Sequence, residues 1–511
     1  MPYLGLEGNG LLTVITITTG MGFILFGYDD GVMGGLLTAP SFTSVFHLSS
    51  AMQGTITSMF TVGAFFGCAI SALFNGRFGR KPCTFLGAVL VGIGAVLQSA
   101  SYQVAQLLVG RIVAGVGLGL VVANIIMWQS ELSPGRIRGL LVASALTFLI
   151  LGDLIALWIE YGIANRPSSY AWRLPLALQA ALALILSGLL LIMPESPRWL
   201  FQNNRESEGL EILTLLNTHK GAVNEEELNK TVKGIQEAIA IESEQSSWQE
   251  FFKGDNLKSR QRVVLACILN ACQAWSGSTP ISYYTTYIFE NSVGLSYNTS
   301  LLLAGVLQIF RMCASVGTWW SIEKLGRRFS LMATSAGMTV VLAIMAAMVS
   351  IDSKPAGIVA SVMLFLFEAF YAWGFMGPIW VYGPEIIPLA HRAKGEGLAT
   401  ACLWLSSFVT VEIVPPAIHN IGWKVYLIFA CANLSFIPFT YFFLPETAGL
   451  SLEAIDLCFM DSNKSPVQKA NELVKELKRG HDVSLDRAFD DDEKVAATSQ
   501  VEYVRTNEAS A

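Results

Sequence analysis

Charged residues are scarce in this chain. Only 14% of its 511 residues are Asp, Glu, Lys or Arg, whereas a soluble protein carries about 25%. Hydrophobic residues make up 53%, and the mean hydropathy is +0.50. The charges gather in short clusters that leave long apolar stretches between them. This composition excludes an ordinary soluble globular domain and predicts a protein of the lipid bilayer.

Residue patterns typical of catalysis or metal binding are also missing. The chain has only five histidines, and we find no HExxH motif, no GxxxxGKS or GxxxxGKT phosphate loop and no His/Cys cluster. The eight cysteines are scattered without a CxxC pair, so we interpret them as small buried thiols. We therefore expect no enzyme activity, no metal and no cofactor. The net charge of −6 comes largely from the C-terminal tail and indicates no nucleic-acid partner.

What the chain has instead is about twelve apolar stretches, each long enough to cross a bilayer as an α-helix. Such a helix needs about 20 residues. The stretches lie near residues 11–37, 52–75, 82–102, 104–128, 140–164, 173–193, 262–289, 299–322, 329–351, 356–382, 395–418 and 423–444. The sequence therefore predicts an all-α membrane protein with about twelve transmembrane helices. Glycines in the fourth stretch, such as Gly110 and Gly115, allow helices to approach closely.

Three short signatures occur twice, about 250 residues apart and in the same order. The pairs are Gly76–Lys81 with Glu323–Arg328, Glu131–Pro134 with Glu385–Pro388, and Pro194–Arg198 with Pro445–Thr447. Such a repeat is typical of secondary transporters built from two halves. We therefore divide the chain into an N-terminal six-helix bundle (1–193), a cytoplasmic connection (194–261), a C-terminal six-helix bundle (262–445) and a cytoplasmic, partly disordered acidic tail (446–511).

Basic residues gather in the loops that follow the even-numbered spans. Examples are Arg77, Arg136, Lys324 and Arg392. The positive-inside rule places these loops, and with them both termini, in the cytoplasm. No basic region precedes the first apolar stretch, so we expect no cleaved signal peptide. The sequon that begins at Asn298 falls on the predicted outer side and is a candidate glycosylation site.

Together these motifs resemble the sugar porter family of the major facilitator superfamily (MFS). The resemblance runs from about residue 20 to 457, and Phe26–Gly35 and Leu450–Asp456 are similar to its fungal branch. It implies two six-helix bundles around a central cavity and alternating access by rocking of one half against the other. It indicates a secondary transporter and says much less about the cargo.

The resemblance also implies a role for the charged cytoplasmic motifs. Arginines of each repeated loop are expected to pair with nearby carboxylates and to latch the two halves together when the cavity opens outward. The residues assigned to this latch are Arg77, Arg80, Glu131, Arg138, Glu323, Arg327, Arg328, Glu385 and Arg392. The alternative is that they only anchor loops to anionic headgroups. Gly76 stands where the family usually has an acid, so we expect weaker contacts in the first half.

Asp29 in the first span and Arg111 in the fourth form the predicted proton-coupling pair. Charges within spans are costly and mark functional sites. In proton-coupled relatives, protonation of such an acid frees the arginine and biases the direction in which the cavity faces. We therefore expect a proton gradient to drive transport. The alternative is a static ion pair. Asp30 is an unusual second acid beside the first.

The cargo site implied by the resemblance departs from the family pattern. Its residues are Leu146, Gln273, Ala274, Thr279, Tyr283, Tyr284, Trp380 and Trp404. Leu146, Ala274 and Thr279 stand where the family usually has amides, and Leu403 where a polar residue is frequent. Amides both donate to and accept from sugar hydroxyls, so their loss favours a larger or less hydroxylated cargo. The alternative is that Gln129, Gln308 or Asp153 supplies the polarity.

Arg311 in the eighth span requires a partner, because a lone buried guanidinium is costly. We expect it to pair with Glu368 or Glu412, or else to bind a carboxylate cargo.

The sequence thus predicts a monomeric, proton-coupled transporter of a sugar, polyol or related small organic molecule in the plasma membrane of a fungal-like cell. One alternative is a transporter or exporter of a non-sugar metabolite. The other is a non-transporting nutrient sensor.

Overall fold

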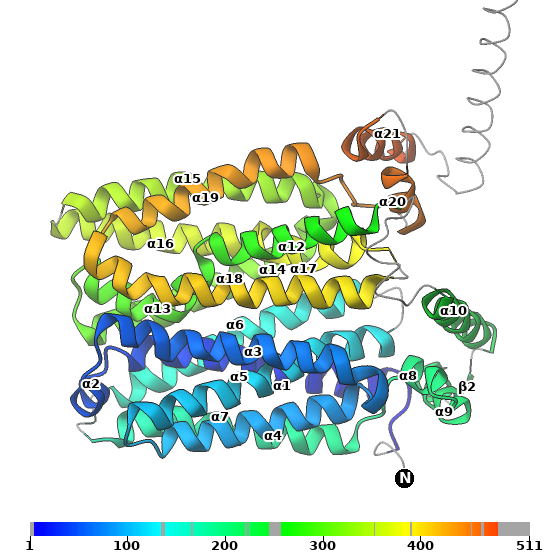
Figure 1. The fold of residues 1–511 in the computed structure, drawn as a ribbon, viewed down its shortest axis with the longest axis horizontal. Coiled ribbons are helices and arrows are strands. Elements are labelled where there is room, and N and C mark those ends of the chain that lie inside the picture. Colours follow the sequence, from blue (N-terminus) through cyan, green and yellow to red (C-terminus); the bar gives the residue numbers. More distant parts are fainter. Residues whose placement is uncertain are drawn as a thin grey trace, which may run out of the picture.

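The fold is a bundle of long helices that run side by side (Figure 1). The computed structural model describes residues 5–133, 138–164, 166, 168–219, 222–223, 225–244, 257–351, 353–388, 391–450, 452–460 and 464–478. The helices of the first half are α1 (Gly8–Leu36), α2 (Pro40–Phe46), α3 (Ser50–Phe78), α4 (Arg80–Ser99), α5 (Val104–Leu132), α6 (Arg138–Ile163) and α7 (Tyr170–Ile192). Those of the second half are α12 (Ser259–Trp275), α13 (Ser278–Asn291), α14 (Tyr297–Leu325), α15 (Arg327–Ile351), α16 (Lys354–Gly374), α17 (Met376–Ile386), α18 (Arg392–Ile421) and α19 (Lys424–Phe443).

Eleven spans in the described part of the chain are long and apolar enough to cross a membrane. The predicted seventh span is the one missing from this set, because Gly277 breaks it into α12 and α13. Gly277 has a φ of +96°, a left-handed conformation that favours glycine. With this broken helix counted as one crossing, the fold has the predicted twelve.

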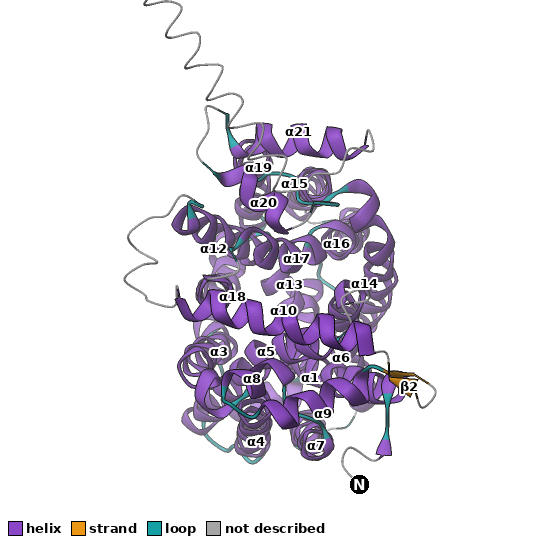
Figure 2. Ribbon diagram, turned by 90° about the vertical axis from the view of Figure 1, so that its right-hand side faces the viewer, coloured by secondary structure: helices purple, strands orange, loops and turns teal. Residues whose placement is uncertain are grey.

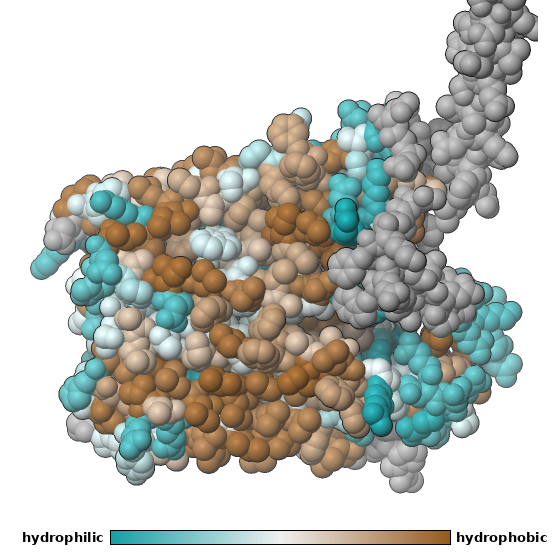
Figure 3. Space-filling model, in the orientation of Figure 1, coloured by the Kyte–Doolittle hydropathy of each residue, from teal (hydrophilic) through white to brown (hydrophobic). Residues whose placement is uncertain are grey.

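The outer surface of the bundle matches a lipid environment. Figure 3 shows a broad hydrophobic band along the helices, with hydrophilic side chains gathered at both ends. Large apolar residues such as Leu184, Leu191 and Ile358 are 66–72% exposed on it. Such a surface is stable in hydrocarbon and not in water. The chain is therefore a multi-pass membrane protein.

Small helices cover the end of the bundle at which α1 begins (Figures 1 and 2). They are α8 (Pro197–Gln202), α9 (Glu206–Leu216) and α10 (Glu225–Glu244) from the connection, with a two-stranded ladder of β1 (Thr218–His219) and β2 (Ala222–Val223). The tail adds α20 (Leu452–Phe459) and α21 (Pro466–Lys478). Phe201 of α8, Leu213 of α9 and Leu228 of α10 form a small core where these helices meet. Residues 479–511 and the acidic run in them lie outside the described residues, so the expected disorder of the tail stays a prediction.

Candidate functional site

A buried ion pair joins α1 and α5. Arg111 donates from Nη1 to both carboxylate oxygens of Asp29, at 2.8 and 3.0 Å. The amide of Gln179 on α7 donates to the same carboxylate at 2.7 Å. The rest of the guanidinium bonds to the carbonyl oxygens of Ile56 and Thr57. Both predicted members of the pair are thus in contact.

A second charge cluster joins the two halves of the molecule. Arg311 on α14 lies 3.4 Å from Asp153 on α6 and 3.2 Å from Glu368 on α16. It also donates to the hydroxyl of Ser282 on α13 at 2.8 Å. The expected pairing of Arg311 with Glu368 is therefore present, and Asp153, expected only as an alternative source of polarity in the cargo site, is its second partner.

Glu412, the other expected partner of Arg311, bonds elsewhere. Its carboxylate accepts from the hydroxyls of Thr55 at 2.8 Å and Ser58 at 2.5 Å. Both hydroxyls lie on α3, so the bonds tie the first half to α18 of the second. Near the same end, the hydroxyl of Tyr297 on α14 donates to the carbonyl oxygen of Gly35 on α1 at 3.3 Å. The two halves are therefore in contact at the end opposite α8–α10.

The residues assigned to the cargo are mostly enclosed in this conformation. Leu146, Ala274, Tyr283, Tyr284 and Trp404 are at most 7% exposed. Thr279 and Trp380 are half-buried.

Two of the cargo residues already use their polar groups. The amide of Gln273 donates to the hydroxyl of Tyr371 at 3.0 Å, and the hydroxyl of Tyr284 donates to the carbonyl oxygen of Val411 at 3.0 Å. Trp404 packs 5.6 Å from Phe26 of the first half, ring centre to ring centre. Its indole N–H lies beside the thiol of Cys68 on α3. It is therefore a buried donor at the interface between the halves.

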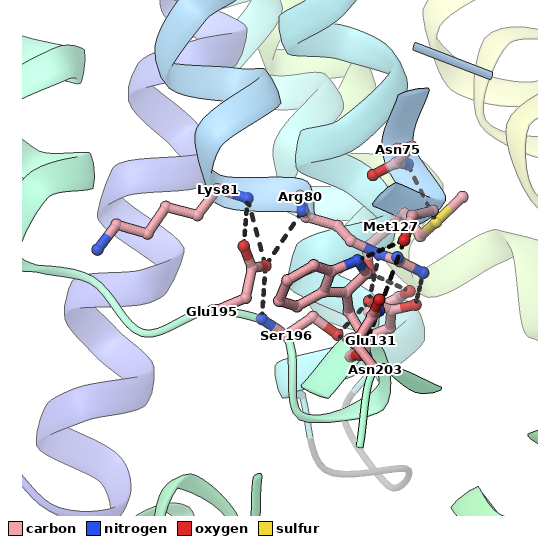
Figure 4. A network of polar contacts seen from close by, with 11 residues as sticks. Asn75, Arg80, Lys81, Met127, Glu131, Glu195, Ser196 and Asn203 are labelled. Atoms are coloured by element: carbon pink, nitrogen blue, oxygen red, sulfur yellow. Dashed lines mark hydrogen bonds and ion pairs between the residues drawn. The ribbon is translucent and has the colours of Figure 1, made fainter. Parts of the chain in front are cut away.

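The first cytoplasmic motif forms a compact polar network (Figure 4). Arg80 makes two bonds to Glu131, at 3.0 and 2.9 Å, and Ser196 donates to the same carboxylate at 2.5 Å. Glu195 accepts from the backbone N–H groups of Arg80, Lys81 and Ser196. Burial raises the pKa of Glu195, and these N–H groups oppose that shift by stabilising its charged form.

The second motif repeats this arrangement. Arg327 bonds to Glu385 at 3.0 Å, and Thr447 takes the place of the serine, donating to Glu385 at 2.7 Å. Glu446 accepts from the backbone N–H groups of Arg327 and Arg328. Acidic groups at these helix N-termini are favourably placed with respect to the helix dipole.

The expected pairings of these arginines with Glu131 and Glu385 are confirmed, whereas the latch between the halves, expected when the cavity opens outward, stays a prediction. The pair of Arg80 with Glu131 lies wholly within the first half, and that of Arg327 with Glu385 within the second. They hold the loops of each half against its own helices. With glycine at position 76, Arg80 still makes both bonds to Glu131, and the expectation of weaker contacts in the first half stays a prediction.

The other predicted cytoplasmic residues have more modest contacts. Arg77 is exposed and lies over the ring of Phe78, 5.9 Å from its centre. Arg392 donates to the carbonyl oxygen of Ile387 at 3.4 Å, within its own half. The side chains of Arg138 and Glu323, assigned to the latch, lie outside the described part of the chain. Asn298 is exposed in the first turn of α14, where it stays a candidate for glycosylation.

Known proteins share both the sequence and the architecture. The profile of a family described as "Sugar (and other) transporter" matches residues 14–459. The chain belongs to this family. It is 34% identical to the sugar transporter STL1 of Saccharomyces cerevisiae, an alignment that covers 92% of this chain and 86% of that one. It is 30% identical to a high-affinity glucose transporter of Kluyveromyces lactis, over 86% and 83% of the two chains.

A solved structure of the MFS proton:xylose symporter XylE bound to 6-bromo-6-deoxy-D-glucose has the same fold. The two structures superpose with a TM-score of 0.76 at 25% identity, over 89% of this chain and all of the other. The chain therefore has the MFS fold of the sugar transporter family. Membership of this family makes it a membrane transporter, as the duplicated motifs predicted.

Sequence reasoning missed several polar residues of this sugar transporter family member. Gln179, Ser282 and Tyr371 are buried and bond to residues of the predicted site. Glu160 on α6 is buried, and its carboxylate lies against the backbone of Gly35 on α1. Glu160 and Gln179 could have been noticed in the sequence, because each is a polar residue within a predicted apolar span. Their contacts depend on which helices are neighbours, which the sequence did not state.

Proposed function

We propose that this protein is a proton-coupled transporter of a small neutral sugar or polyol, with Asp29 as the group that takes up the coupling proton. The observation that carries the proposal is the buried pair of Asp29 and Arg111 with its third partner Gln179. When Asp29 is charged, it holds Arg111 between α1 and α5. A proton on the carboxyl oxygen removes that attraction and releases the guanidinium, so the helices can rearrange.

The neutrality of the cargo follows from the state of Arg311. This guanidinium is the intramembrane cation that a cargo carboxylate would need, and it lies between Asp153 and Glu368. An anionic cargo would bring a third acid to a buried guanidinium that two carboxyl groups already share, which is costly. The names of similar proteins, a sugar transporter and a high-affinity glucose transporter, favour a polyhydroxylated cargo.

Asp29→Asn tests the coupling role. We expect it to abolish accumulation driven by a pH gradient, because asparagine cannot exchange a proton. Equilibrative exchange is expected to survive better, since it needs no net proton movement. Purified protein in proteoliposomes is assayed with labelled glucose, xylose and glycerol, with and without an inward proton gradient. Glu208→Gln removes an exposed carboxylate that pairs with Arg205 and is the matched control. Gradient-driven accumulation by Asp29→Asn at the wild-type level would refute the coupling role.

The proposed location is the plasma membrane, with both termini in the cytoplasm. The clustered arginines and lysines lie at the same end of the bundle as α8–α10 and α21, which supports this orientation. An epitope added at the C-terminus should then be labelled by antibody only after cells are permeabilised. Labelling of intact cells would reverse the orientation.

A further inference from the structure

The cluster around Arg311 has one carboxylate too many. Asp153 and Glu368 both lie against a single guanidinium, and all three side chains are at most 3% exposed. Within the described residues, no second cation forms an ion pair with either carboxylate. At the Asp29 site, by contrast, the carboxylate lies 2.8 Å from Arg111 and also accepts from Gln179. Two charged carboxylates beside one cation would leave an uncompensated negative charge in a low-dielectric interior.

The hydrogen bonds of the cluster are also incomplete. One oxygen of Asp153 and both oxygens of Glu368 have no hydrogen-bond donor. The contact of Arg311 with Asp153 is 3.4 Å, longer than the 2.8 Å between Arg111 and Asp29. A charged pair normally contracts to about 2.7–2.9 Å. The long contact and the empty acceptor sites suit a neutral carboxyl better than a carboxylate.

The surroundings of Asp153 identify which carboxyl holds the proton. On the side of α1, Asp30 is close enough to interact with it electrostatically, and a side chain at Gly31 would touch its Oδ1 atom. On the side of α16, Glu368 acts on it in the same way, and the one cation facing it is Arg311 on α14. Asp153 thus has an acid on two sides, and protonation there removes both repulsions.

We propose that Asp153 is a second proton-binding site, protonated while α6 and α14 are in contact across the two halves. The inference rests on the proposed proton coupling and adds a site to it. A proton on Asp153 weakens its attraction to Arg311, which then pairs with Glu368 within the second half. When the halves separate and water reaches Asp153, the proton can leave, so proton release is linked to the movement itself.

Infrared pH-difference spectroscopy on the purified full-length protein in lipid nanodiscs tests this site without any cargo. A protonated carboxyl gives a C=O stretch that a carboxylate lacks. We expect the wild type to show a carboxylic-acid component that is lost in Asp153→Asn. The same component should persist in Asp29→Asn and in Glu160→Gln, which removes a different buried carboxyl. Identical acid bands in the wild type and Asp153→Asn would overturn the proposal.

A second variant keeps the test valid if Asp153→Asn folds poorly. Glu368→Gln leaves Asp153 as the sole acid that pairs with Arg311, so we expect its acid component to appear only at lower pH than in the wild type. An unshifted component would contradict the proposal. Because the experiment uses neither cargo nor gradient, it separates this site from the proposed function. Loss of the component in Asp153→Asn supports the site even if Asp29→Asn still accumulates cargo, and its persistence overturns the site even if uptake is coupled.

Discussion

Two buried charge pairs in the spans join side chains of different helices. Asp29 on α1 contacts Arg111 on α5, and Asp153 on α6 contacts Arg311 on α14. Such charges cost several kcal/mol in hydrocarbon unless they are paired. The pairs therefore determine which helices stay neighbours, and a change of protonation acts directly on helix packing.

A substitution at Leu146 tests whether the cargo site lacks hydrogen-bonding groups for a sugar. Leu146 is 6% exposed and offers no hydrogen bond to a sugar. We expect Leu146→Gln to raise the affinity for glucose, because one added hydrogen bond contributes about 0.5–1.5 kcal/mol, or about two- to tenfold in Kd. Leu146→Met, which keeps the volume without a donor, is the control. The measurement is saturable glucose uptake, and strong uptake by the wild type would show that other residues supply the polarity.

Trp380 is predicted to stack on the cargo rather than to support the fold. It is half-buried, whereas Trp172 is fully enclosed between Phe42 and Phe46. We expect Trp380→Ala to lower cargo affinity with little change in the melting temperature. Trp172→Ala should do the reverse, since a core Trp→Ala costs about 3–5 kcal/mol. Uptake kinetics and thermal melting in detergent measure both effects, and normal uptake by Trp380→Ala would contradict the assignment.

At the level of elements, glycine decides how closely α3 and α5 pack. A Cβ at Gly115 would overlap the carbonyl oxygen of Phe60 on α3, whereas a Cβ at Gly188 on α7 meets nothing within 4 Å. The overlapped atom belongs to the backbone of α3, which cannot move aside as the end of a flexible side chain can.

We therefore expect Gly115→Ala to destabilise the protein by about 1–3 kcal/mol, the usual cost of overpacking. Gly188→Ala should be neutral or slightly stabilising, because alanine is the better helix former. Thermal melting of the two variants in the same detergent makes the comparison. Equal melting temperatures would mean that α3 and α5 do not rely on this close approach.

The molecule as a whole is held in its present conformation by contacts between its halves. Glu412 accepts two hydroxyl hydrogen bonds from α3. Hydrogen bonds to a charged group are worth about 1.5–3 kcal/mol each. Their loss should favour separation of the halves at this end, where α3 begins and α18 ends.

Glu412→Ala is therefore expected to increase the rate at which a reagent labels the interface between the halves by about tenfold or more. A suitable reporter is Thr57→Cys, because Thr57 is completely buried on α3 beside Tyr284 of the second half. Its rate of labelling by a membrane-impermeant maleimide is measured against a background without this substitution. Thr410→Ala, whose hydroxyl bonds only within α18, is the control. An unchanged rate would show that Glu412 does not hold this end closed.

The sequence by itself determined the apolar spans, the duplication and the family, because each is carried by residues that are close together in the chain. Hydropathy over about 20 residues predicts a crossing wherever its neighbours lie. The Asp29–Arg111 pair was also predictable, since the family motif names both positions. The break at Gly277 was not, because the apolar pattern runs through it and only the backbone conformation shows the two helices.

Only the tertiary structure decided the partners of the remaining charges in the spans. Arg311 selects Asp153, 158 residues away, because α6 and α14 are neighbours across the two halves. Glu412 bonds to hydroxyls of α3 instead. Periodicity and composition show which side chains lie on each face of a helix. Which charged side chains meet depends on how the helices pack, and the packing follows from the fit of all their surfaces together.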